Sequence, residues 1–290
     1  MRPDVRGTQS FKGGMHHGEG PNRNFEAPLK ADLHLHTTAS DGSMTPAKVV
    51  EWAKKGGLDV MAITDHDTVA GLAEGKAKAE ELGIKFVPGI ELSAFSVMEI
   101  HILGYNVPYE NKEFLAALDG VQNQRIERNK LIGEKLRACG FDLDIDFSAK
   151  GLGRMNMARE MVAKGYAKDV PEAFDKWLGT GAKCYAEAKR LTPIDAVKLI
   201  KSFGGFASIA HPKKYLLDGR LEMLVEGLKR FGLDGLEVNY PSHTEDDKQK
   251  LVNLCKKYRL LETGGSDFHG DEDKDFIFNL SDFTRRALHI

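Results

Sequence analysis

Short apolar runs rich in β-prone residues alternate along much of the chain with segments whose apolar positions recur at helical spacing. Runs of this kind predict strands, and the seven expected strands span residues 31–36, 58–64, 84–94, 99–105, 204–212, 233–241 and 260–269. Strands that alternate with helices through short connections are typical of a parallel sheet or barrel. The pattern therefore predicts an α/β fold.

Capping residues mark where several helices of this α/β pattern begin and end. Thr45 and Pro46 are suited to a helix N-cap and first position, and Gly56 closes that segment. The same reasoning predicts further helices at 71–82 before Gly83, after Thr192-Pro193, at 221–232 and after Thr244.

The rhythm changes between residues 106 and 191, where helical patterns at 114–140, 157–165 and 170–179 follow one another without intervening strands. This stretch predicts a helical insertion that covers the active site. The barrel is then discontinuous, formed by 30–105 and 192–290. Residues 1–29 are rich in Gly, Asn, Pro and charge, and they predict a disordered leader or a cloning remnant.

Composition adds limits to this picture. The 290 residues are 41% hydrophobic and 29% charged, which is ordinary for a soluble protein with a real core. No apolar run approaches the ~18 residues of a membrane span, so the cytoplasm is the expected location. The three cysteines form no CxxC pattern, and the formal charge of −2 gives no general attraction to nucleic acid.

Histidines and carboxylates gather beside the predicted strands. His34 and His36 are two positions apart, so on a strand they face the same side and can bind one cation, although strand histidines that only satisfy hydrogen bonds are about as common. Similar clusters recur near later strands. The nine candidate metal ligands are His34, His36, Asp41, His66, Glu91, His101, His211, Asp267 and His269.

The order of these motifs, HxH, D, DHD, GIE, H, AHP and GSDFH, resembles the PHP (polymerase and histidinol phosphatase) family over about residues 31–270. The sequences around the last two motifs, AHPKKY and GSDFHG, are most similar to those of the stand-alone bacterial phosphoesterases of that family. The resemblance implies a distorted (β/α)7 barrel, with an inserted helical subdomain and three metals at the carboxyl ends of the strands.

The resemblance also implies how the ligands divide. One metal takes His34, His36, Glu91 and Asp267; Glu91 bridges to a second metal held by His101 and His211; Asp41, His66 and His269 hold the third. Mixed imidazole and carboxylate ligands suit Mn, Zn or Fe. Clustered metals make hydroxide available near neutral pH and neutralise the phosphoryl oxygens during attack.

Substrate contacts are expected from Arg154 and Lys214, whose positive charges suit phosphate. Related enzymes often have Arg at the Lys214 position and His at that of Asn156, so these two positions depart from the family pattern. His243 and Asp267 are the candidate catalytic residues. His243 follows a strand and is suited to donate a proton or bind phosphate, with a loop-capping role as the alternative.

The expected function is hydrolysis of phosphate monoesters of nucleotides, including 3′,5′-bisphosphonucleotides and nucleoside monophosphates, and of the 5′ ends of short RNA. The alternatives are a histidinol-phosphate phosphatase and a non-catalytic PHP metal-binding module. No basic stripe with interleaved aromatic residues indicates a grip on extended duplex nucleic acid. A monomer without a membrane partner is expected.

Overall fold

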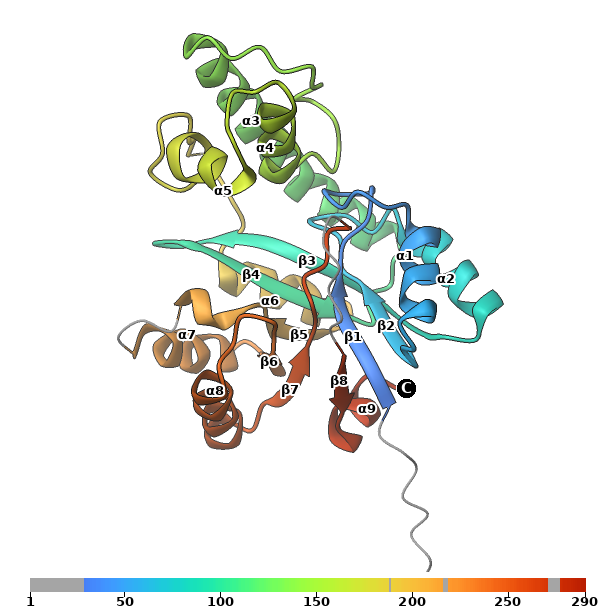
Figure 1. Cartoon of the computed structure of the whole chain (residues 1–290). Helices are drawn as coiled ribbons and strands as arrows, with labels where there is room; N and C mark the ends of the chain where they lie inside the picture. Colours follow the sequence, from blue (N-terminus) through green and yellow to red (C-terminus); the bar gives the residue numbers. More distant parts are fainter. Residues whose placement is uncertain (1–28, 188, 216–218, 271–276) are drawn as a thin grey trace, which may run out of the picture.

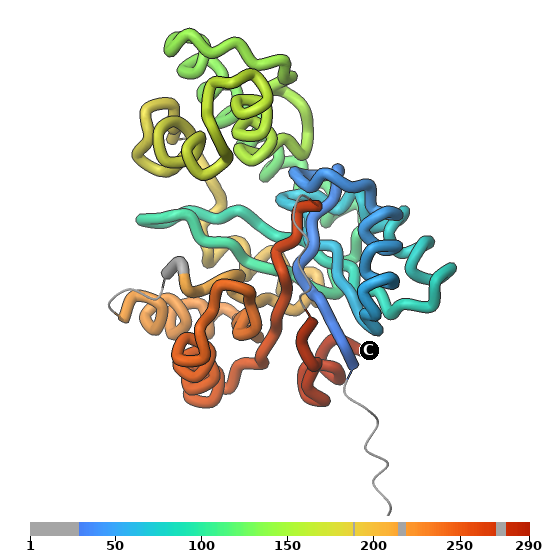
Figure 2. Tube along the Cα trace, in the orientation of Figure 1, coloured from blue at the N-terminus to red at the C-terminus, as the bar shows by residue number. Residues whose placement is uncertain are grey.

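A computed structural model of the protein describes residues 29–187, 189–215, 219–270 and 277–290. These residues contain one sheet with the strand order β7-β6-β5-β4-β3-β2-β1-β8. The strands are β1 (Leu29–Leu35), β2 (Val60–Ile63), β3 (Lys85–Phe95), β4 (Glu99–Tyr105), β5 (Phe206–Ile209), β6 (Gly235–Asn239), β7 (Leu261–Gly264) and β8 (Phe278–Leu280). The sheet curves into a nearly closed barrel (Figures 1 and 2).

The barrel closes where the segment after β7 meets β1. The Asp267 N–H donates to the His34 carbonyl and the His36 N–H donates to the Phe268 carbonyl, each at 2.9 Å. We call this pair of contacts the seam. Gly265 permits the approach, because a Cβ at that position would lie only 2.2 Å from the His34 Cβ. The seam therefore joins two predicted ligand segments through their backbones.

All seven predicted strands are present, but two features differ from the expected parallel barrel. β4 runs antiparallel to both β3 and β5, because only a tight turn separates it from β3. β8 was not predicted and pairs antiparallel with β1, followed by α9 (Asp282–Ala287). A strand of three residues leaves too short an alternation to be recognised in a sequence. The α/β barrel class itself is confirmed.

The barrel helices lie where the sequence predicted them. They are α1 (Pro46–Lys55), α2 (Leu72–Leu82), α6 (Pro193–Ser202), α7 (Arg220–Lys229) and α8 (Glu245–Tyr258). The side chains of Thr45, Thr192 and Thr244 each accept a hydrogen bond from the backbone N–H three residues later. A short helix, η2 (Pro212–Tyr215), follows β5. No helix of the described residues is long and apolar enough to cross a membrane.

Residues 106–191 contain α3 (Lys112–Ala138), α4 (Arg154–Ala163), α5 (Val170–Ala173) and the π-helix η1 (Phe174–Leu178). Figure 1 shows α4, α5 and much of α3 beyond the barrel, with the β3–β4 hairpin on that side. Ile132, Met157 and Leu178 belong to a separate apolar cluster there. Phe114 and Leu118, at the start of α3, pack instead in the barrel core.

α3 therefore joins the two apolar clusters, and the division at residues 106 and 191 stays a prediction. The predicted leader, residues 1–29, lies outside the described residues except for Leu29, which begins β1.

Candidate metal centre and arginine-lined cavity

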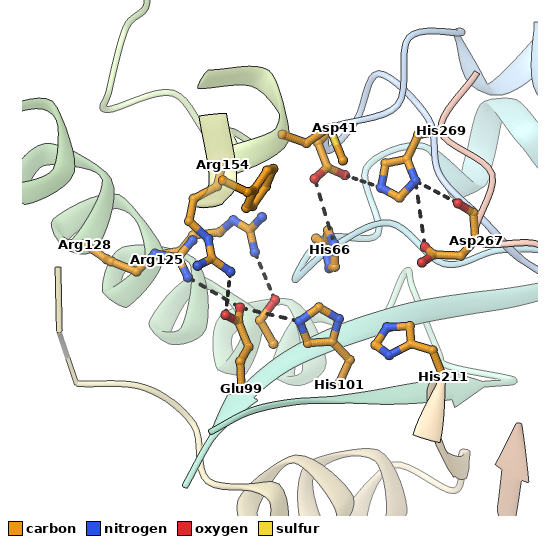
Figure 3. Close-up of a pocket in the computed structure, with 13 residues that line it drawn as sticks. Asp41, His66, Glu99, His101, Arg125, Arg128, Arg154, His211, Asp267 and His269 are labelled. Atoms are coloured by element: carbon orange, nitrogen blue, oxygen red, sulfur yellow. Dashed lines mark hydrogen bonds and ion pairs between the residues drawn. The ribbon is translucent and has the colours of Figure 1, made fainter. Parts of the chain in front are cut away.

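The structure brings all nine predicted ligands together at one end of the barrel. β1 and the segment after it supply His34, His36 and Asp41, the loop after β2 supplies His66, and the antiparallel pair β3 and β4 supplies Glu91 and His101. His211 follows β5, while Asp267 and His269 follow β7. Residues far apart in the sequence thus face one centre, part of which Figure 3 shows.

Within the described residues, three groups of side chains offer ligand atoms within 4.8 Å of one another. The groups are His34, His36, Glu91 and Asp267; His36, Asp41, His66 and His269; and His66, Glu91 and His101. The first is the set that the family resemblance implies for one metal, and the second contains the set implied for the third metal with His36 added.

Glu91 lies at the middle of these groups. Its Oε2 is 3.1–3.3 Å from nitrogens of three imidazoles, those of His34, His36 and His66. Its Oε1 lies 2.8 Å from His101 Nδ1 and 3.1 Å from His211 Nε2. Each oxygen of one carboxylate therefore faces a different set of imidazoles, which is the arrangement needed to bridge two cations.

The ionisation of the centre is shaped by burial and by mutual charge. Burial opposes ionisation of Glu91, but the surrounding His66, His101 and His34 hold the pKa of its carboxyl well below the usual value. Burial likewise disfavours the charged form of His36, yet Asp267 and Glu91 raise its pKa to about 10. Protons on imidazoles such as those of His36 and His101 thus balance the carboxylates, whereas burial lowers the pKa of His66 well below its usual value. Cations that bind here would replace these protons.

The donor set fits divalent metal ions. Several of these atoms are buried and lie within ion-pair distance of a carboxylate or imidazole partner, yet they make no hydrogen bond within the part of the chain that the structure describes: His34 Nε2, both ring nitrogens of His36, His66 Nδ1 and Glu91 Oε2. Buried polar atoms without partners are costly, and metal coordination satisfies them.

Buried carboxylates support the centre from behind. Glu237 on β6 accepts from His34 Nδ1 at 3.1 Å with one oxygen and from the His211 backbone N–H with the other. Asp32 accepts from the backbone N–H groups of His34 and Ser266, so it holds the seam and not an imidazole. Glu237 was missed in the sequence, where the signal is a charged residue between the apolar positions Leu236 and Val238.

A cavity of about 180 Å³ opens beside the centre and is shown in Figure 3. Its far wall carries Arg128 of α3 and Arg154 of α4, together with Glu99, which begins β4. The Glu99 carboxylate lies 2.5 Å from Arg154 and 3.9 Å from Arg128, and it also lies 3.4 Å from Arg190. We call these three arginines with Glu99 the arginine cluster.

Arg125 stands apart from this cluster because it has its own counter-ion. Its Nη1 donates to Asp67 at 2.6 Å and to Ser93 at 3.0 Å. Arg159, also on α4, donates to the Asp41 carbonyl and so steadies the loop that carries this ligand.

Of the predicted substrate residues, the structure places one at the cavity and two away from it. Arg154 lines the cavity, but the Asn156 side chain accepts from the Gly153 N–H at 2.7 Å and so caps α4. His243 is buried, does not line this cavity, and donates through Nδ1 to the Val238 carbonyl. Lys214 lies in η2, and its side chain is outside the described residues. Arg128, Arg190 and Glu99 were missed, because charged residues on a helix, in a connecting segment or at a hairpin normally face solvent.

A barrel with clustered imidazoles and carboxylates at one end defines a class of metal-dependent hydrolases, and the comparisons agree. The family model described as PHP domain matches residues 32–190, more than half of the chain. The chain belongs to the PHP domain family.

Relatives named for their activities support this membership. The chain is 35% identical over 247 residues to a 5′-3′ exoribonuclease of Haemophilus influenzae, covering 83% of this chain and 90% of the relative. It is 34% identical over 246 residues to a 3′,5′-nucleoside bisphosphate phosphatase of Chromobacterium violaceum, covering 82% and 86%.

A crystal structure described as a putative metal-dependent phosphoesterase of Bifidobacterium adolescentis superimposes with a TM-score of 0.79 at 29% identity, covering 89% of this chain and 94% of that one. The predicted family and enzyme class are confirmed: the protein is a hydrolase of phosphoric ester bonds. The family and the His, Asp and Glu groups together indicate divalent metal ions.

Proposed function

We propose that the protein hydrolyses phosphate monoesters of nucleotides, with 3′,5′-bisphosphonucleotides, nucleoside monophosphates and 5′ ends of short RNA as substrates, at a centre of three divalent metal ions. The observation that carries the proposal is the arginine cluster beside the nine candidate ligands. One end of the cavity suits the phosphoryl group that reacts, and the other suits a second phosphate.

Charge explains why the arginine cluster suits a phosphate. Three guanidinium groups share the single carboxylate of Glu99, so the arginine cluster carries a net charge of +2. Arg128 and Arg154 of this cluster line the cavity, whereas Arg190 does not. Burial, with the nearby Arg125, Arg154 and Arg190, lowers the pKa of Arg128 to about 9. A phosphate monoester carries close to two negative charges at neutral pH and accepts paired N–H donors, which matches this surplus.

The candidate ligands hold the reacting end. His34, His36, Glu91 and Asp267 would bind one ion, Glu91 with His101 and His211 a second, and Asp41, His66 and His269 a third; Mn, Zn and Fe all suit these donors. Bound ions of this kind lower the pKa of a coordinated water and neutralise phosphoryl oxygens. Glu91 would lie between these ions, and Glu237 accepts a hydrogen bond from the ring of His34 and so fixes its orientation.

The metal part of the proposal is tested with Glu91→Gln. An amide cannot bridge two cations as a carboxylate does, so we expect metal content and phosphoesterase activity to fall together. Elemental analysis and turnover of p-nitrophenyl phosphate measure the two quantities. Wild-type metal content with wild-type turnover in this variant would contradict the bridging role.

The substrate part is tested with Arg128→Gln and a matched control, Arg137→Gln. Both residues lie on α3, but the Arg137 guanidinium stacks over Phe147 and does not line the cavity. Losing a charge-assisted contact costs ~1.5–3 kcal/mol, so Arg128→Gln should lower kcat/KM for a 3′,5′-bisphosphonucleotide by roughly 10- to 150-fold. In Arg137→Gln, kcat/KM for the bisphosphonucleotide should change little. In Arg128→Gln, kcat/KM for p-nitrophenyl phosphate should also change little.

A panel of mononucleotides, bisphosphonucleotides, short 5′-phosphorylated RNA and histidinol phosphate separates the proposed substrates from the histidinol-phosphate alternative. Preference for histidinol phosphate would sink the nucleotide assignment while leaving the enzyme class intact. The monomeric state and cytoplasmic location stay predictions, the first checked by light scattering.

A further inference from the structure

We infer that Phe174, with Met155, binds the nucleobase of the substrate. The inference rests on the proposed nucleotide function and names the part of the cavity that recognises the base. Of the thirteen residues that line the cavity, only these two have apolar side chains; the other eleven are His, Asp, Glu, Arg or Ser. An apolar face inside so polar a cavity suits the one part of a nucleotide that is flat and uncharged.

The position of the ring relative to the arginine cluster supports this assignment. The Arg154 guanidinium lies 5.8 Å from the centre of the Phe174 ring, and the same guanidinium binds Glu99 and donates to the Leu178 carbonyl at 3.2 Å. Arg154 therefore touches the proposed phosphate position on one side and the ring on the other. A nucleotide needs its phosphate and base sites to be close neighbours in this way.

The local backbone holds the ring at the cavity. Phe174 begins the π-helix η1, and its carbonyl accepts from the Gly179 N–H at 2.7 Å. π-Helical turns are rare and occur frequently at functional sites, because they redirect side chains that a regular helix would place elsewhere. Phe174 remains partly exposed, whereas Leu178 at the other end of η1 is fully buried.

Packing of the helical cluster is the competing explanation, since Phe174 also contacts its apolar core. Phe141 provides the comparison. Its ring packs against Tyr166 and edge-on against Trp177, at 4.6 Å between the Phe141 and Trp177 ring centres, and it does not line the cavity. A substitution at Phe141 therefore reports loss of packing alone.

The stacking contact predicted at Phe174 should form with any of the four bases, because every base has a π-face. It also predicts weak discrimination among the four bases and a clear preference for nucleotides over the same sugar bisphosphate without a base. The arginine cluster and the metal centre alone give no reason for such a preference.

The experiment compares Phe174→Leu, Phe174→Trp and the control Phe141→Leu on adenosine 3′,5′-bisphosphate and on ribose 3,5-bisphosphate. Stacking accounts for roughly a 5- to 150-fold effect per base when an aromatic ring is removed, so Phe174→Leu should raise KM for the adenosine compound several-fold with little change in kcat. The abasic compound should be unaffected, and Phe174→Trp should retain affinity. Titration calorimetry with adenosine 3′,5′-bisphosphate on metal-free protein gives a second readout that does not need turnover.

Equal losses on the two compounds, or equal losses in Phe174→Leu and Phe141→Leu, would overturn the inference and assign Phe174 to packing. Those outcomes leave the proposed function standing. Absence of wild-type activity on adenosine 3′,5′-bisphosphate would instead count against the proposed function, so the two failures are distinguishable.

Discussion

Glu237 shows how much of the candidate metal centre depends on a residue that is not itself a proposed ligand. It is fully buried and contacts both His34 and the backbone of His211. Partners of this kind orient metal-bound imidazoles, and their loss typically costs 10- to 100-fold in metal affinity.

We therefore expect Glu237→Gln to bind divalent metal roughly 10- to 100-fold more weakly, measured by competition with a chromogenic chelator. Glu262→Gln is the matched control, since Glu262 lies on the neighbouring strand β7 and pairs in register with Leu236. Unchanged metal affinity in Glu237→Gln would show that His34 and His211 are positioned by the barrel alone.

At the residue scale, the pH dependence of stability and the effect on turnover distinguish two roles of His243, a structural hydrogen-bond donor and a catalytic acid. Burial lowers the pKa of its imidazole in the folded protein, so the unfolded chain takes up a proton first as the pH falls below about 6.5. Acid therefore destabilises the fold through this residue, and stability is recovered as the pH rises through that window. His243→Asn keeps a donor for the Val238 carbonyl and removes the titration.

In metal-free protein, wild type should lose thermal stability relative to His243→Asn between about pH 7 and pH 5. Loss of a general acid typically lowers turnover 10²- to 10⁴-fold. Since His243 lies outside the cavity, we expect less than a ~3-fold change in turnover. A large loss of turnover would support the catalytic role that the sequence suggested.

At the scale of elements, replacing glycine by alanine is expected to change the free energy of unfolding in opposite directions at Gly265 and Gly227. A Cβ at Gly265 would lie 2.5 Å from the His34 backbone nitrogen, whereas at Gly227 in α7 it would meet nothing within 4 Å. Gly265→Ala should destabilise the protein by ~1–3 kcal/mol, because backbone must move. Gly227→Ala should stabilise it by ~0.5–1 kcal/mol through helix propensity. Urea unfolding measures both, and a neutral Gly265→Ala would mean that the strands do not approach as described.

The elements also show what a sequence of this kind can and cannot predict. Strands ending in histidine motifs and helices opened by Thr45 or Thr192 were predictable, because alternation and capping are local properties. The direction of β4 was not, since an apolar alternation is the same in either direction. Arg128 and Arg190 were missed for a related reason: their burial depends on α3 and the segment after η1 meeting over Glu99, which no local pattern records.

At the scale of the whole molecule, the seam and the candidate metal centre occupy the same place. His34 and His36 lie on one side of the seam, and Asp267 and His269 lie on the other. Opening the seam in a metal-loaded protein would therefore require ligands to leave a shared cation. Metal binding should then stabilise the closed barrel.

Hydrogen exchange measures this coupling. Loading with Mn or Zn should slow exchange of the His36 and Asp267 amides more than that of the Leu251 amide, which lies within α8. Equal slowing at all three amides would indicate general stabilisation without a special link between metal and seam.

The seam has a further consequence for how the chain folds during synthesis. Its neighbouring hydrogen bond from Ser266 to Asp32 joins residues 234 positions apart, and contacts of such long range form late because the intervening loop must close first. Six candidate ligands precede residue 106, yet Asp267 follows His101 by 166 positions. At about 5–20 residues per second, a ribosome needs roughly 8 to 33 s to synthesise the chain from His101 to Asp267. During that interval the nascent chain carries an incomplete ligand set, and the metal affinity of the complete set is reached only when the segment after β7 emerges and the barrel closes.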